Sequence, residues 1–255
     1  MIVELIALFF IALIASFFAS FSGGAGLITV PATMFFGLPP AEAIATNRVG
    51  WIASMGALLN VKGKLNIGKK IPLLLIIAHV SGAIIGTLIL ISIPNQDLLF
   101  RIIGLLLIAG SFFTYFSPKG TVTKTRKDLS SRAIFACGSL LFGLGIFRGF
   151  FGPASGIINR LIIVETLGID YIQTIALSTY LWAISSLVTA IIVIAAGLFN
   201  FVYAIPLALG MLIGFYFGTK YAINKGNEFI KKFFVAIELL SGIYFLLFGI
   251  GAIGG

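Results

Sequence analysis

The sequence carries one apolar pattern twice, and this duplication restricts the fold more than any other feature. The first half contains FSGGAGLITVPATMFFGLPPAEAIATNRVGWIASMGA, and the second contains FFGPASGIINRLIIVETLGIDYIQTIALSTYLWAISSL. Gly26 matches Gly156 in this comparison, and Trp51 matches Trp182. A repeat of this length is a duplicated half-protein rather than a solenoid unit.

The composition places both halves in a lipid bilayer. Hydrophobic residues make up 60% of the chain and charged residues 10%, and the mean hydropathy is +1.15, which lies outside the range of soluble domains. Duplicated halves in such a chain are typical of secondary transporters, which hold their substrate between the two repeats. We therefore predict an all-α polytopic membrane protein with two inverted-topology repeats of about five helical segments each. Each repeat contains a glycine-broken helix pair, which gives eight full spans plus short half-helices, or ten segments.

The basic residues determine the predicted orientation. The formal net charge is +9, but Lys and Arg gather at the ends of apolar runs, which indicates membrane topology rather than nucleic-acid binding. We predict cytoplasmic loops near 62–70, 118–132 and 220–232. The connections near Pro94 and Asn200 carry almost no basic charge, so we expect them outside the cell membrane, together with both termini.

Matched segments end in loops of opposite character. The first-half segment 40–60 ends in the basic loop at Lys62, whereas its copy, 171–196, ends in the neutral loop at Asn200. The two copies therefore cross the membrane in opposite directions, as in an inverted repeat. The predicted first repeat covers 1–117, the basic cytoplasmic linker 118–132 and the second repeat 133–255. The predicted long helices cover 2–21, 40–60, 71–91, 98–116, 133–151, 171–196, 201–222 and 229–253.

Two apolar segments, 27–36 and 157–167, are too short to cross a bilayer, which takes about 20 helical residues. Each follows a break of small residues, SGGAG in the first half and GPASG in the second. Non-helical backbone inside a membrane is tolerated where protein buries it or a wet cavity solvates it. We therefore expect both breaks to line a central cavity.

The start of a helix exposes unpaired backbone N–H groups and the positive end of the helix dipole. We expect such starts at Leu27 and Ile157, facing one another, and a small anion is the natural ligand for them. Close packing of helices through small residues is the alternative reading of the same glycines. For Gly82, Gly86, Gly210, Gly214 and Gly218, which recur at helical spacing, packing is the favoured reading.

The paired glycine-rich breaks, each followed by a short helix, a GLPPAEA or GIDYIQT turn and an ATN or ALS step, resemble the TauE/SafE family of sulfite exporters. The resemblance covers nearly the whole chain. It implies a transporter of sulfite, organosulfonates or related small anions. The second break departs from the family pattern at Pro153, Ala154 and Ser155, and Asn47 stands where the family usually has Ser. We therefore expect an asymmetric site.

Arginine inside a membrane is costly and is retained when it has a partner or a function. Arg48, Arg148 and Arg160 stand in apolar segments, and a guanidinium fits two oxygens of an oxyanion. Pairing with a carboxylate, or snorkelling of the side chain to the lipid headgroups, is the alternative. The predicted substrate-binding residues are Gly23, Gly24, Ala25, Gly26, Asn47, Arg48, Trp51, Pro153, Ala154, Ser155, Gly156, Asn159, Arg160 and Ser178.

Glu238 and His79 are the candidates for carrying a coupling proton, although either could have a purely structural role. We expect no catalytic residue, metal, cofactor or nucleic-acid partner, and the sequence does not indicate an oligomeric state. Two other functions are compatible with these residues. A passive anion channel could use the same helix starts, and Ser155 with His79 could form an intramembrane serine hydrolase pair.

Overall fold

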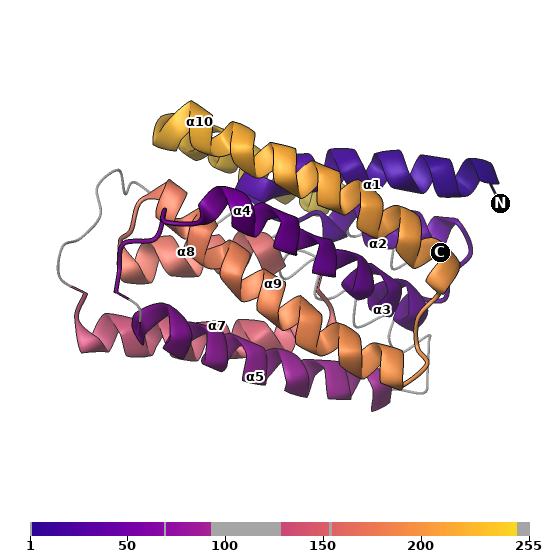
Figure 1. Cartoon of the computed structure of the whole chain (residues 1–255), viewed down its shortest axis with the longest axis horizontal. Coiled ribbons are helices and arrows are strands. Elements are labelled where there is room, and N and C mark those ends of the chain that lie inside the picture. Colours follow the sequence, from indigo (N-terminus) through magenta and orange to yellow (C-terminus); the bar gives the residue numbers. More distant parts are fainter. Residues whose placement is uncertain (1, 69, 93–128, 153–154, 249–255) are drawn as a thin grey trace.

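The structure is a computed structural model that describes residues 2–68, 70–92, 129–152 and 155–248, and within these ranges all regular secondary structure is helical (Figure 1). The predicted helix 98–116 and most of the linker 118–132 lie outside the described residues. In chain order the helices are α1 (Ile2–Ser22), α2 (Gly26–Phe35), α3 (Pro40–Gly50), the 3₁₀ helix η1 (Trp51–Ala57), α4 (Leu58–Val61), α5 (Lys70–Ser92), α7 (Ser131–Phe150), α8 (Ser155–Leu167), α9 (Tyr171–Ala195) and α10 (Phe201–Phe248).

Five of the described helices are long and apolar enough to cross a membrane: α1, α5, α7, α9 and the first part of α10. The prediction of an all-α polytopic membrane protein is confirmed. The two short helices are also where the sequence predicts them, since α2 begins at Gly26 and α8 at Ser155. The inverted orientation of the repeats in the membrane, the domain boundaries and the sidedness of the termini stay predictions.

Helix boundaries follow from local chemistry. Ser130 begins α7 by accepting the Ala133 amide at 3.2 Å, and Asp170 begins α9 by accepting the Gln173 amide at 2.9 Å. Both are N-caps, which satisfy amides that have no partner in the first helical turn. Pro40 starts α3, a position where its missing N–H costs nothing.

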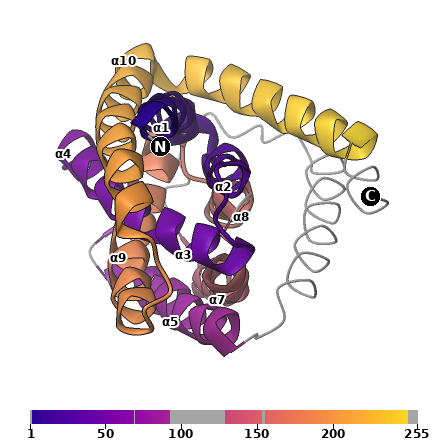
Figure 2. The same cartoon turned by 90° about the vertical axis from the view of Figure 1, so that its right-hand side faces the viewer.

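The helices form three layers (Figure 2). One outer layer pairs α1 with the first part of α10, and the opposite outer layer pairs α5 with α7; α2, α3, α8 and α9 lie between them. Each outer pair combines the first helix of one half with the fourth predicted segment of the other half. The two halves of the sequence therefore exchange helices, and neither forms an outer layer alone.

Glycines set the distance within both outer pairs. A methyl group at Gly82 or Gly86 of α5 would collide with backbone of α7, and one at Gly145 of α7 would collide with the His79 carbonyl. In the other pair, Gly210, Gly214 and Gly218 of α10 lie against α1 in the same way. This is the close backbone approach that small residues allow between membrane helices. The packing reading of these glycines is confirmed.

The predicted helix 40–60 is not uniform, because the α-helix gives way to 3₁₀ geometry at Trp51–Ala57. Gly50 precedes this stretch and packs against Leu207 of α10, and Gly56 lies within it and packs against Leu212. Glycine has low helix propensity and allows a close approach. The matched positions in α9 are Leu181 and Leu187, and α9 is an unbroken α-helix.

The predicted helix 201–222 and the described part of the predicted helix 229–253 both lie in α10, which is kinked at Gly226. Its φ is 79° and its ψ is 178°, which is not helical geometry. Beyond this residue, α10 turns and runs across one side of the molecule (Figure 2). The segment 220–232, predicted as a basic loop, is therefore helical on both sides of Gly226 rather than a loop.

The first prediction concerns the α5–α7 pair. Gly145→Ala should lower the free energy of unfolding by about 1–3 kcal/mol, because the new methyl group must push two backbones apart. Gly143→Ala, two residues earlier on α7, is the matched control, since nothing lies within 4 Å of a methyl group there. Thermal unfolding in detergent measures both. Equal melting temperatures for the two variants would contradict the packing.

Candidate functional site

The two glycine breaks meet at the centre of the molecule. Gly23 and Gly24 have φ of 85° and 86°, and Gly152 has φ of 85°, a conformation that L side chains rarely adopt. A methyl group on Gly156 would lie 2.9 Å from the Gly24 nitrogen and 3.3 Å from the Trp182 ring. The breaks are therefore in contact, and α2 and α8 extend from them toward opposite ends of the molecule (Figure 1).

The amides at the first break differ from the prediction in one respect. The Leu27 amide, expected to be unpaired, donates to the Gly24 carbonyl at 2.9 Å, because the helix begins with a tight turn. The amides of Gly24, Ala25 and Gly26 have no acceptor among the described residues. The free N–H groups of this helix start thus lie one to three residues earlier than predicted.

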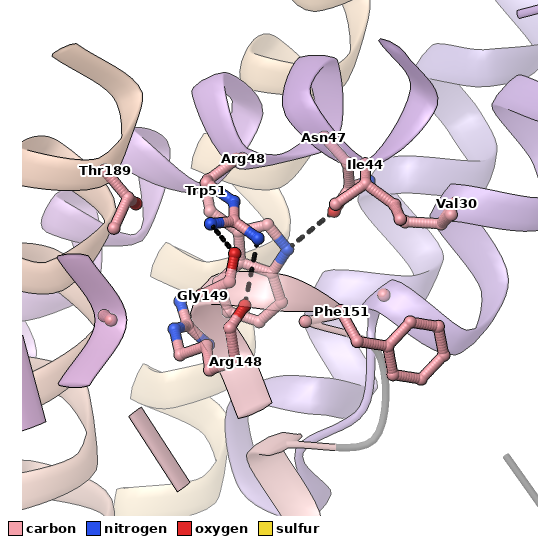
Figure 3. Close-up of a pocket in the computed structure, with 12 residues that line it drawn as sticks. Val30, Ile44, Asn47, Arg48, Trp51, Arg148, Gly149, Phe151 and Thr189 are labelled. Carbon is pink, nitrogen blue, oxygen red and sulfur yellow. Dashed lines mark hydrogen bonds between the residues drawn. The ribbon is translucent and has the colours of Figure 1, made fainter. Parts of the chain in front are cut away.

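A cavity of about 30 Å³ lies beside the breaks (Figure 3). This volume holds about one water molecule. Its walls come from α2, α3, η1, α5, α7, α9 and both breaks. The lining residues are Gly26, Val30, Ile44, Asn47, Arg48, Trp51, Ala83, Arg148, Gly149, Phe151, Gly152 and Thr189.

The Arg48 guanidinium donates hydrogen bonds to three acceptors of the protein. Its Nη1 donates to Thr87 Oγ1 and to the Gly149 carbonyl, both at 2.6 Å, and its Nη2 donates to the Arg148 carbonyl at 2.9 Å. The two carbonyls belong to the last turn of α7, where the helix dipole is negative. Arg48 of the first half therefore caps the first helix of the second half (Figure 3).

Arg160 makes the reciprocal contact. Its Nη2 donates to the carbonyls of Ala19 and Ser20 at 3.0 and 2.7 Å, in the last turn of α1. Arg160 of the second half therefore caps the first helix of the first half. Among the described residues, Arg48 and Arg160 therefore pair with carbonyl groups at helix ends and not with a carboxylate, which was the alternative considered from the sequence.

Arg148 has fewer protein partners. Its Nη2 donates to Ser186 Oγ at 2.9 Å, and the described residues offer no other acceptor to its guanidinium. The group lies 5.0 Å from the centre of the Trp51 ring and 5.9 Å from that of Trp182. Cation–π contacts of this kind hold a guanidinium in place and leave its N–H groups available. Arg148 lines the cavity, so it is the arginine best placed to receive an anion.

The described buried residues include these three arginines and no Asp or Glu. A buried charge without a partner is costly, and it either acquires a counter-ion or is removed by evolution or by deprotonation. Two of the arginines face helix C-termini, which supply only partial negative charge. Among the described residues, the centre of the molecule therefore carries more buried positive charge than negative charge.

The two halves use the same polar bridge with the residues exchanged. Asn47 Nδ2 donates to Thr29 Oγ1 at 2.6 Å in the first half, and Asn159 Nδ2 donates to Ser178 Oγ at 2.8 Å in the second. Thr29 occupies the position matched to Asn159, and Asn47 the position matched to Ser178. Each bridge ties a short helix to the long helix that follows it. Sequence reasoning missed Thr29, although the repeat pairs it with a predicted site residue.

The other predicted residues fall into three groups. Ser155 Oγ donates to the Gly152 carbonyl at 2.5 Å, and His79 Nδ1 lies 3.1 Å from the Leu141 carbonyl. No hydrogen bond joins these two among the described residues, so the structure gives no support to a hydrolase pair. Pro153 and Ala154 lie outside the described residues, and Glu238 lies in the part of α10 whose side chains are not described.

The family model for the sulfite exporter TauE/SafE matches residues 8–245, nearly the whole chain. The chain belongs to the TauE/SafE family. This TauE/SafE chain matches no solved structure.

Curated relatives of this TauE/SafE chain are membrane transporters by description. "Probable membrane transporter protein ORF9" from Sinorhizobium is 30% identical over 94% of this chain and 91% of its own length. A "Probable membrane transporter protein" from Haemophilus influenzae is 28% identical over 93% of each chain. "Probable membrane transporter protein YfcA" from Escherichia coli K12 is 28% identical over 91% of this chain and 85% of its own. The chain is therefore a multi-pass membrane transporter protein.

The second prediction separates the two cavity arginines by stability. Arg48→Met should lower the free energy of unfolding by at least about 2 kcal/mol, because it leaves buried carbonyls of α7 and a threonine hydroxyl without their donor. Arg148→Met should have little effect or raise stability, because it removes a buried charge with few protein partners. Thermal unfolding in detergent measures both variants. A larger loss for Arg148→Met than for Arg48→Met would contradict these assignments.

Proposed function

We propose that this protein is a secondary transporter that moves a small sulfur-containing anion, such as sulfite or a sulfonate, across the cytoplasmic membrane by alternating access. One observation carries the proposal: buried arginines surround the point where two helix breaks meet, and the described residues include no buried carboxylate to pair with them. The family supplies the substrate class, because its description is that of a sulfite exporter.

The chemistry of the site supports an oxyanion. Arg148 offers a guanidinium with unpaired N–H groups, and such a group binds two oxygens of one ligand. The free amides from Gly24 to Gly26 add donors without a side chain in the way. A neutral solute would leave the arginine charge uncompensated, whereas an oxyanion accepts hydrogen bonds and neutralises it.

The volume of the cavity supports a conformational cycle. About 30 Å³ is small for a sulfite with its four heavy atoms, so we propose that the site widens to admit substrate. The glycine-packed outer pairs are suited to move as units, because their backbones are in contact. We propose that these pairs rock against the middle layer and open the site to each side in turn.

A passive channel is the second candidate, because it could use the same helix starts. Flux that saturates with substrate and responds to an imposed proton gradient supports a transporter, whereas large unitary currents support a channel. His79 is the described candidate for a coupling proton, since it is buried in α5 and its Nε2 has no partner among the described residues. Glu238 stays a candidate from sequence alone.

The third prediction tests the proposed function directly. In proteoliposomes, Arg148→Gln should reduce saturable sulfite or sulfoacetate uptake by at least about tenfold, because it removes a charged donor worth about 1.5–3 kcal/mol. Arg132→Gln, an exposed change near the start of the same helix, is the matched control and should transport normally. Labelled sulfite, sulfoacetate, thiosulfate and sulfate assayed on one sample identify the preferred anion. Wild-type levels of transport by a folded Arg148→Gln variant would refute the site.

A further inference from the structure

We infer that Arg160 and Trp182 form a second anion subsite, separate from the cavity beside Arg148, which takes an oxyanion of the same class. This inference rests on the proposed function, because it adds a second position to the same substrate pathway. It explains a group of buried polar atoms around the second short helix that have no partner among the described residues.

Arg160 is the first element of this subsite. The residue is 2% exposed, and only its Nη2 is satisfied by the carbonyls at the end of α1. Its Nε and Nη1 are buried and have no acceptor among the described residues. Unpaired N–H groups on a buried cation are too costly to be structural filler, so they indicate an acceptor that enters from outside the chain.

Trp182 supplies a further donor at the same place. It is also 2% exposed, its Nε1 has no acceptor among the described residues, and its ring centre lies 5.1 Å from the Arg160 guanidinium carbon. Gly156 lies against the same ring and against the Gly24 amide. The donors therefore border the contact between the two breaks.

The first half shows why these atoms lack partners. There, Trp51 Nε1 donates to Asn47 Oδ1 at 2.9 Å, so the tryptophan and the asparagine satisfy each other. In the second half the asparagine stands on the short helix as Asn159, and the position matched to Asn47 is Ser178. Trp182 Nε1 and Asn159 Oδ1 are consequently both unpartnered among the described residues. One half closes this site internally, and the other leaves it open to a ligand.

The position beside Arg160 and Trp182 is distinct from the cavity beside Arg148. Neither Arg160 nor Trp182 is among the residues that line the cavity. The balance of charge also favours a second position. One monovalent anion beside Arg148 leaves Arg160 with only helix carbonyls as acceptors among the described residues. Two anions bring the buried region closer to neutrality.

The test is equilibrium binding of ³⁵S-labelled sulfite to the full chain in lipid nanodiscs under anaerobic buffer. The wild type should bind two sulfite ions at saturation. Trp182→Phe and Arg160→Gln should each lose one, with affinity at that position falling by about tenfold or more, whereas Arg148→Gln should lose the other. Trp182→Phe should keep the helical fold, which circular dichroism checks, because the change keeps an aromatic ring and its Nε1 makes no bond within the described protein.

The outcomes distinguish this inference from the proposed function. If the wild type binds one sulfite, which Arg148→Gln removes and both Trp182→Phe and Arg160→Gln retain, the second subsite is refuted while the transporter stands. Two bound ions in Trp182→Phe would also refute it. If the wild type neither binds nor transports any anion of the panel, the proposed function fails and the second subsite fails with it.

Discussion

Buried positive charge, with no buried carboxylate among the described residues, is the constraint on which the rest of this structure depends. A guanidinium in an apolar interior needs acceptors, and the chain supplies them from the last turns of its first helices rather than from acidic side chains. Arg48 donates hydrogen bonds to carbonyl groups in the last turn of α7, and Arg160 donates to those in the last turn of α1. Because those helices end at the glycine breaks, the two guanidinium groups lie beside the breaks.

This arrangement also connects the two halves. Each capping arginine belongs to one half and holds the first helix of the other, and each glycine-packed outer pair is shared in the same way. A movement of either outer pair therefore changes the surroundings of an arginine at the centre. That coupling gives a physical route by which occupation of a central anion site and the opening of one side could influence each other.

Helix limits and the short half-helices are predictable from sequence because local signals determine them: capping residues, glycine breaks and the length of apolar runs. Two features are not. The 3₁₀ stretch after Gly50 depends on close packing against α10, which no local pattern reveals. The exchange of partners between Asn47 and Asn159 depends on which atoms face each other across helices. The sequence predicts an asymmetric site there, but it does not show which donors of the second half lack an acceptor among the described residues.

The most direct measurement is the position of a bound oxyanion in an experimental structure. Selenite is a heavier analogue of sulfite, and its anomalous scattering locates it without reference to the protein. The account predicts a peak between the two breaks, within hydrogen-bonding distance of the Arg148 guanidinium. Selenite found only at surface lysines, at a concentration that saturates transport, would contradict the central claim that the uncompensated arginines form the anion site.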